Sequence, residues 1–166
     1  MSKSSAKAIT AAAPKAVIPR VGEGRRGEAG YLGYLLRQAA HAQRRRMDRA
    51  LATVGLTHPQ FLVMTMIRAY PGCSNADIAR LTLLTPQTVH AIVAALRCKM
   101  LVSRQPHPVH GRILSIALTN AGKALLARGR ARALAVESAL KDMMTDRAEA
   151  AVRRWLVDIA RAAPAE

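Results

Sequence analysis

The segment from residue 74 to residue 122 constrains the fold most strongly, because signals for helix, turn and strand follow one another closely in it. Ser74 can cap a short helix, and residues 82–84 read as the turn that ends it. Thr85 can then cap a longer helix with Pro86 in its first turn, where the missing backbone N–H leaves no bond unmade. Two helices joined by a short turn are therefore expected here.

Two strand-like runs follow this pair of helices. Residues 101–104 and 113–118 are rich in Leu, Val and Ile, and the loop between them contains two prolines and a glycine. Thr119 can cap a further long helix. This order of elements is typical of a winged helix-turn-helix, which places its second helix in the major groove of DNA. We expect a mainly α fold with a small β-wing.

The charge of the chain favours a polyanionic partner. It has 26 Lys and Arg residues against 10 Asp and Glu residues, a formal net charge of +16, and no acid lies between Ile78 and Val136. Three interpretations fit this charge. The surface binds nucleic acid, it binds an anionic membrane, or it is a solvated surface without a partner. Residues 71–154 contain no aromatic side chain on which unpaired bases could stack, which favours double-stranded DNA.

Outside this segment the chain divides into a tail and long helices. Residues 1–27, rich in Ala, Lys, Ser, Gly and Pro, predict a flexible basic N-terminal tail. Apolar residues recur every three or four positions over 28–54, and Gly55 is expected to end that helix. Residues 119–162 predict two more helices, the second capped by Thr145.

The sequence contains no motif that would support a metalloprotein, an enzyme, or a membrane or secreted protein. Cys73 and Cys98 form neither a disulfide framework nor a zinc pattern, and His107 and His110 have no third ligand nearby in sequence, so no metal or other cofactor is expected. The motifs of serine hydrolases, phosphate-binding loops and zinc proteases are missing, so we expect no enzyme. No apolar run reaches 18 residues and no signal-peptide pattern occurs, which favours a reducing cytoplasm and no membrane.

The pieces GLTHPQFLVM, SNADIARL and TPQTVHAIVAALRCKMLVSR, with a wing ending in ALTNAGKALL, resemble the MarR family of bacterial transcription regulators in order and spacing. The likeness covers about residues 29–162. It implies a homodimer in which 28–54 and 119–162 form the dimerisation region and 55–118 the winged helix-turn-helix DNA-binding domain. It also implies a cytoplasmic, nucleoid-associated repressor whose paired recognition helices enter successive major grooves of a palindromic operator.

The resemblance places the recognition helix over residues 85–100. Gln87, Thr88 and their neighbours on one face are short or polar and suit base edges. Three positions depart from the family pattern. His110 replaces the aspartate that precedes the wing arginine, and Ala91 stands where the reading face usually carries a long basic residue. Met100 replaces the glycine that ends the helix, so we expect that helix end to differ. The residues expected to contact DNA are Ser74, Thr85, Pro86, Gln87, Thr88, His90, Ala91, Arg97, Arg104 and Arg112.

Family members often bind small aromatic or phenolic acids in a cleft beside the winged module, and release DNA when they do. An arginine beside aromatic rings suits a ring that carries a carboxylate. The alternative is that Tyr34 and Phe61 are core residues, an interpretation that fits Phe61 best. The candidate effector-binding residues are Tyr34, Arg37, His41, His58 and Phe61.

Three alternatives stay open on the sequence. Cys98 lies between Arg97 and Lys99, so it is either a redox-sensing thiol that disables DNA binding or a buried, inert cysteine. A structural protein that coats DNA with low specificity would fit the charge, the basic tail and the small side chain of Ala91. A helical protein of the membrane surface would fit the basic amphipathic segment 124–141.

Overall fold

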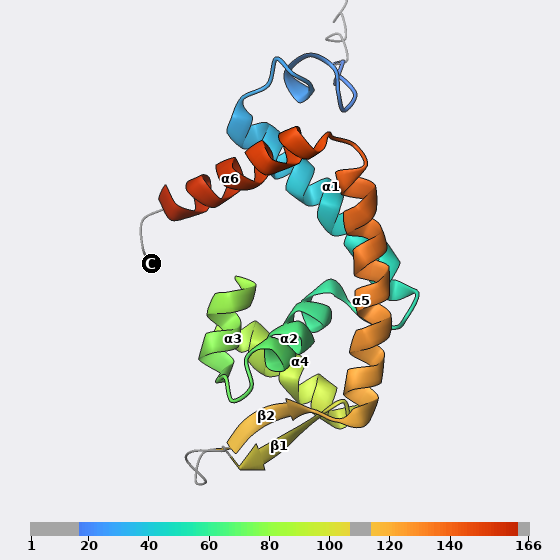
Figure 1. The fold of residues 1–166 in the computed structure, drawn as a ribbon, viewed down its shortest axis with the longest axis vertical. Helices are drawn as coiled ribbons and strands as arrows, with labels where there is room; N and C mark the ends of the chain where they lie inside the picture. Colours follow the sequence, from blue (N-terminus) through green and yellow to red (C-terminus); the bar gives the residue numbers. More distant parts are fainter. Residues whose placement is uncertain (1–16, 107–113, 163–166) are drawn as a thin grey trace, which may run out of the picture. The chain divides into compact units, whose positions relative to one another are not determined.

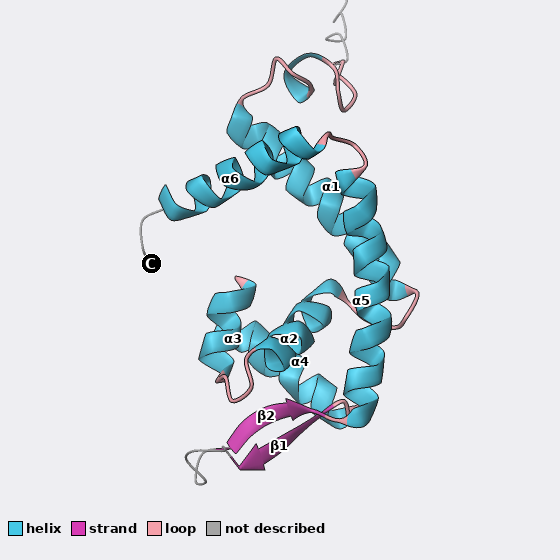
Figure 2. Cartoon of the chain, viewed as in Figure 1, coloured by secondary structure: helices cyan, strands magenta, loops and turns pink. Residues whose placement is uncertain are grey.

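The computed structural model describes residues 17–106 and 114–162, which form helices and a two-stranded antiparallel sheet (Figure 2). The predicted mainly α fold with a small β-wing is confirmed. Contacts divide the chain into two units, one ending at His41 and one beginning at Ala42. A 3₁₀ turn, Gly24–Arg26, comes first. The other elements, labelled in Figure 1, are α1 (Leu32–Ala52), α2 (His58–Ala69), α3 (Asn75–Thr82), α4 (Pro86–Cys98), β1 (Val102–Pro106), β2 (Leu114–Leu118), α5 (Asn120–Lys141) and α6 (Asp146–Ala162).

The first unit contains a hydrogen-bonded turn ahead of α1. The Arg26 guanidinium donates to the Pro19 carbonyl at 2.9 Å, and the Gln38 amide donates to the Arg26 carbonyl at 3.1 Å. A Cβ on Gly30 would lie 2.3 Å from the Arg25 carbonyl oxygen. This close approach of two backbone segments leaves no room for a side chain at position 30, and α1 begins at Leu32 rather than at the predicted residue 28. Residues 1–16 of the predicted tail lie outside the described residues.

The helix caps predicted at Ser74, Thr85, Thr119 and Thr145 are confirmed, and Thr57 caps α2 in the same way. Each cap hydroxyl accepts a hydrogen bond from the backbone N–H three residues further along, which satisfies a donor that the first helical turn leaves free. The donor–acceptor distances are 3.3 Å at Thr57, 3.2 Å at Ser74, 3.1 Å at Thr85, 3.0 Å at Thr119 and 3.3 Å at Thr145.

The core of the second unit lies where α2, α3 and α4 meet α5 and the sheet. Its fully buried side chains include Met64, Ile78, Leu96 and Leu126. The strands pair antiparallel from Val102 with Leu118 to Pro106 with Leu114. Figure 1 shows α2, α3 and α4 gathered beside the sheet, from which α5 leads away. This packing turns the opposite face of α4 outward.

The end of α4 contradicts the expectation drawn from Met100. This residue takes the left-handed conformation, φ +55°, that a glycine usually supplies. Its N–H donates to the Arg97 carbonyl at 2.8 Å, and the next N–H, of Leu101, donates to the Leu96 carbonyl at 2.9 Å. These are the two bonds of a Schellman motif. The bonds, together with burial of Leu96 and Val102 on either side, hold methionine in a conformation that it rarely adopts.

The start of α3 combines a capping box with an ion pair. The Ser74 N–H donates to the Asp77 carboxylate at 3.0 Å, and the Arg80 guanidinium also contacts that carboxylate. The hydrogen bonds from Ser74, and then the bond from Arg80, lower the pKa of Asp77 from 3.8 to about 2. The carboxylate therefore stays ionised in the folded protein down to low pH.

The last helix, α6, has no buried residue in the described chain. Val152, Leu156 and Ile159 lie on one side of it, together with Trp155, which is 41% exposed. Glu149 in its first turn binds Arg153 at 2.7 Å and Lys141 at the end of α5 at 3.1 Å. The helix is thus tied to α5 at its start and presents an apolar face along its length. Within the described residues, no helix is apolar enough over a sufficient length to cross a bilayer.

Replacement of Met100 by glycine should stabilise the protein. The left-handed conformation costs a non-glycine residue about 1–2 kcal/mol, and the Met100 side chain is 76% exposed, so little packing is lost. We expect Met100→Gly to gain about 1 kcal/mol, which raises the melting temperature by about 2–4 °C. The control is Lys99→Gly, at a position with φ −85°, which should lower stability by about 0.5–1 kcal/mol. If calorimetry finds Met100→Gly no more stable than the parent, the left-handed conformation of Met100 does not cost the stability that we infer.

The ionised Asp77 should give α3 a stabilisation that depends on pH. Its pKa is lower in the folded chain than in the unfolded chain, so the stabilisation is complete above pH 3.8 and is lost as the pH falls toward 2. We expect Asp77→Asn, which keeps the shape without the charge, to unfold at a lower temperature than the parent at about pH 7. This difference in melting temperature should shrink as the pH falls below 3.8 and should close at about pH 2. A gap that stays constant with pH would show that the charge contributes nothing.

Candidate nucleic-acid interface

The two faces of α4 differ as the sequence predicts. Val89, Val93 and Leu96 are buried on the inner face, where they contribute to the core. The outer face carries short or polar side chains, all of them exposed: Gln87, Thr88, His90, Ala91 and Ala94. An exposed face with side chains this short lets the helix backbone approach a groove closely, and the Gln87 amide can both donate to and accept from a base edge.

The beginning of α4 is held by its cap. The Thr85 and Thr88 hydroxyls lie 2.8 Å apart, and the Thr88 N–H donates to the Thr85 hydroxyl. Pro86 occupies the first turn and is exposed. Ser74 plays the same part for α3: its hydroxyl accepts from the Asp77 N–H at 3.2 Å and also donates to the Asp77 carboxylate at 2.7 Å. The hydroxyls of Thr85, Thr88 and Ser74 therefore already take part in capping, which leaves Gln87 and His90 as the polar side chains directed only outward.

The cationic residues predicted to contact phosphates are only partly described. Arg97 is exposed near the end of α4, beside exposed Lys99. Arg104 pairs through its backbone with Ile116 in the sheet. Arg112, together with His107 and His110, lies outside the described residues. The described part of the interface thus consists of the outer face of α4 with cations at its end.

The turn between α3 and α4 contains Leu83, a residue whose importance could not be predicted from its type or spacing. Leu83 has φ +55° and is 93% exposed. The next N–H, of Leu84, donates to the Ala79 carbonyl at 3.1 Å and closes the turn. The role of Asp77 was also missed, although the Ser-x-x-acid spacing with Ser74 is a recognisable capping signal.

Cys98 is exposed at the last position of α4, so the interpretation as a buried, inert cysteine is wrong. Cys73 is half-buried, and its burial raises the pKa of its thiol. Within the described chain no three His, Cys, Asp or Glu side chains are grouped as metal ligands would be.

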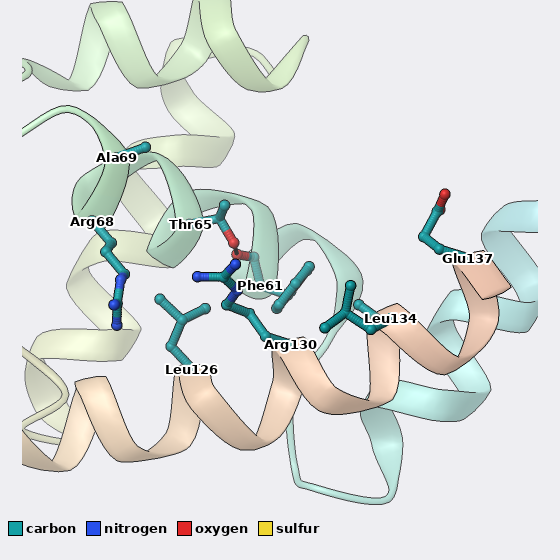
Figure 3. A pocket seen from close by; sticks show the side chains of 9 residues that line it. Phe61, Thr65, Arg68, Ala69, Leu126, Arg130, Leu134 and Glu137 are labelled. Carbon is teal, nitrogen blue, oxygen red and sulfur yellow. Dashed lines mark hydrogen bonds between the residues drawn. The ribbon is translucent and has the colours of Figure 1, made fainter. Parts of the chain in front are cut away.

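A cavity of about 390 Å³ lies between α2 and α5. We call it the α2–α5 cavity. Phe61 and Leu126 form its apolar wall, and Arg68 on α2 and Arg130 on α5 supply cations (Figure 3). Figure 3 shows Arg130 reaching toward Phe61 and Thr65. A Cβ on Gly129 would lie 3.1 Å from the Phe61 ring, so the glycine lets this ring rest on the backbone of α5.

The predicted effector residues are not all brought together. Phe61 lines the α2–α5 cavity. It is only 9% exposed and also belongs to the core, which was the alternative interpretation of this residue. His58 begins α2, and burial lowers its pKa. Tyr34, with Tyr31 and two arginines, lines a separate hollow in the first unit. Arg37 and His41 are exposed on α1.

The arrangement matches known transcription regulators. A family model described as MarR family matches residues 54–113. The HTH-type transcriptional repressor Rv2887 of Mycobacterium tuberculosis (strain ATCC 25618 / H37Rv) is 32% identical over 125 residues, which cover 75% of this chain and 90% of Rv2887.

Two solved structures have the same fold. Rv2887 in complex with p-aminosalicylic acid is 29% identical, and the match covers 79% of this chain and 99% of that one with a TM-score of 0.65. The transcriptional repressor CouR, bound to a 23-mer DNA duplex, is 29% identical, with coverage of 78% and 92% and a TM-score of 0.70. The chain therefore belongs to the MarR family of winged helix-turn-helix transcription regulators.

Proposed function

We propose that the protein is a homodimeric repressor that inserts α4 into the major groove of a palindromic operator and is released by a small aromatic acid. The observation that carries this proposal is the outer face of α4, which is exposed, capped at its start, free of acids and followed by Arg97 and Lys99. Base contacts would come from Gln87 and His90, and phosphate contacts from Arg97, Arg104 and Arg112. CouR, with the same fold, has been solved on a DNA duplex.

Dimerisation accounts for the apolar face of α6. Val152, Trp155, Leu156 and Ile159 are each about two-fifths exposed in the single chain, which would leave a continuous apolar surface in water. A second copy would cover this surface on both partners at once, because a two-fold interface uses the same patch twice. Two α4 helices at a fixed separation would then read two half-sites.

The effector is assigned to the α2–α5 cavity. Its volume is within the range of small-molecule sites. Phe61 offers a ring face, while Arg68 and Arg130 offer planar donors that match a carboxylate. The acid in the lining, Glu137, accepts a hydrogen bond from Gln43 at 3.3 Å. Rv2887 has been solved with p-aminosalicylic acid, a ligand of this chemical class. In this proposal Arg68 and Arg130 take the place expected for Arg37.

Removal of the Gln87 amide should relax base selection. We expect Gln87→Ala to reduce the preference for the operator over random duplex by about 1–3 kcal/mol, while the slope of log affinity against log salt, about −0.9 per phosphate contacted, stays unchanged. Competition binding with the palindrome nearest the protein's own gene measures both. The control Arg97→Ala should instead reduce the salt slope. Equal binding of the parent protein to random DNA would favour the DNA-coating alternative and contradict the repressor.

Loss of the Arg130 charge should weaken binding of the effector without weakening binding of DNA. We expect Arg130→Met, which keeps the aliphatic stem, to reduce salicylate affinity about tenfold or more, because a charged hydrogen bond contributes about 1.5–3 kcal/mol. The matched control is Arg128→Met, an exposed arginine on the same helix outside the cavity lining. Calorimetric titration gives the affinities. A loss of the same size in both variants would place the effector elsewhere.

A further inference from the structure

A second cavity lies between the last turns of α1 and another face of α5. We call it the α1–α5 cavity, and it is an open hollow of about 480 Å³. Its lining shares no residue with the α2–α5 cavity. The positions on α5 that line the two cavities are offset around the helix, so one helix separates them. The residues that matter for its chemistry are Arg46 and Ala50 on α1, Arg132, Val136 and Ala139 on α5, and Met143 in the turn that follows α5.

The charged groups in this lining are two arginines from two different helices. No ion pair among the described residues involves Arg46 or Arg132. The Thr53 hydroxyl, which also lines the cavity, already donates to the Ala50 carbonyl at 2.7 Å. The polar chemistry left for a ligand is therefore that of two guanidinium groups, which bind a carboxylate through paired N–H donors.

The rest of the lining is aliphatic and mostly small. Ala50 and Ala139 leave room, and Val136 and Met143 supply apolar contact. Unlike the α2–α5 cavity with Phe61, this lining contains no aromatic ring on which a planar ligand could stack. Met143 is unbranched and flexible, so it can follow the shape of a ligand chain.

The two walls are held together close to the cavity. One turn before Arg46, the Gln43 amide on α1 donates to the Glu137 carboxylate on α5 at 3.3 Å. This bond spans residues far apart in the sequence and fixes the spacing of the helices beside the two arginines. The cavity is thus present before any ligand arrives, which lowers the cost of binding.

We propose that the α1–α5 cavity binds an aliphatic monocarboxylate, separately from the aromatic effector. The carboxylate lies between Arg46 and Arg132, and the alkyl chain lies along Ala139 and Met143. The charge of the lining selects an anion, and the lack of rings selects a flexible chain over a planar one. This site goes beyond the proposed repressor function and does not depend on it.

The test is calorimetric titration of the full chain with butanoate, hexanoate and octanoate. Each buried methylene contributes about 0.8 kcal/mol, so affinity should rise about fourfold per methylene until the cavity is filled. Arg46→Met and Arg132→Met should each reduce octanoate affinity about tenfold or more. Ala139→Phe, which fills the cavity, should abolish binding.

Matched controls separate this site from general charge attraction. Arg45→Met and Arg128→Met remove exposed arginines from the same helices outside the lining and should leave octanoate affinity unchanged. Arg130→Met in the α2–α5 cavity should also leave it unchanged, so failure of the effector proposal is distinguishable from failure of this one. Losses of equal size in all arginine variants overturn the proposal.

Two further results would overturn the α1–α5 site. One is octanoate affinity that does not change in Arg46→Met and Arg132→Met, both of which alter exposed side chains and so preserve the fold. The other is a shift of the protein to monomer in Ala139→Phe, measured by sedimentation, because this would show that a second copy of the chain occupies the cavity.

Discussion

The backbone carbonyl of Leu101 is the contact on which the placement of the DNA-binding elements depends. It accepts hydrogen bonds from the Thr119 N–H at 3.1 Å and from the Thr119 hydroxyl at 3.2 Å. Gly122 lies so close that a Cβ there would come within 2.0 Å of this oxygen. The end of α4, the start of β1 and the start of α5 therefore meet at one point. Backbone contact, rather than a flexible loop, sets the direction of α4 relative to α5.

This junction connects the two cavities to α4 through α5. Arg130 and Arg132 lie on one continuous helix that begins at the contact with Leu101, and each lines a different cavity. A ligand can change DNA affinity only if it binds two arrangements of the protein unequally. A ligand in either cavity would contact α5, and α5 starts at the junction with the end of α4.

The features that could be predicted from the sequence are those that depend on neighbouring residues. The caps at Ser74, Thr85 and Thr119, and the inner and outer faces of α4, follow from spacing within a single helix. The left-handed conformation of Met100 could not be predicted, because it is imposed by the packing of Leu96 and Val102 on either side of it. Local propensity is overridden there by tertiary contact.

The two cavities could not be predicted from the sequence, for a related reason. Arg68 and Arg130, or Arg46 and Arg132, meet only because helices distant in the sequence pack together, and nothing in either helix alone indicates a shared site. The exposure of Cys98 could not be predicted either, because it depends on how the last turn of α4 packs against the rest of the chain. Candidate effector residues chosen by type, such as Arg37 and His41, are therefore not among the residues that line the α2–α5 cavity.

The apolar face of α6 also carries the chain's single tryptophan, Trp155, while α4 has no aromatic side chain at all. Its indole is partly in water in the lone chain, and any surface that covers this face moves it into a drier environment. The emission of Trp155 is therefore an intrinsic optical signal, in unlabelled protein, of what covers the apolar face of α6.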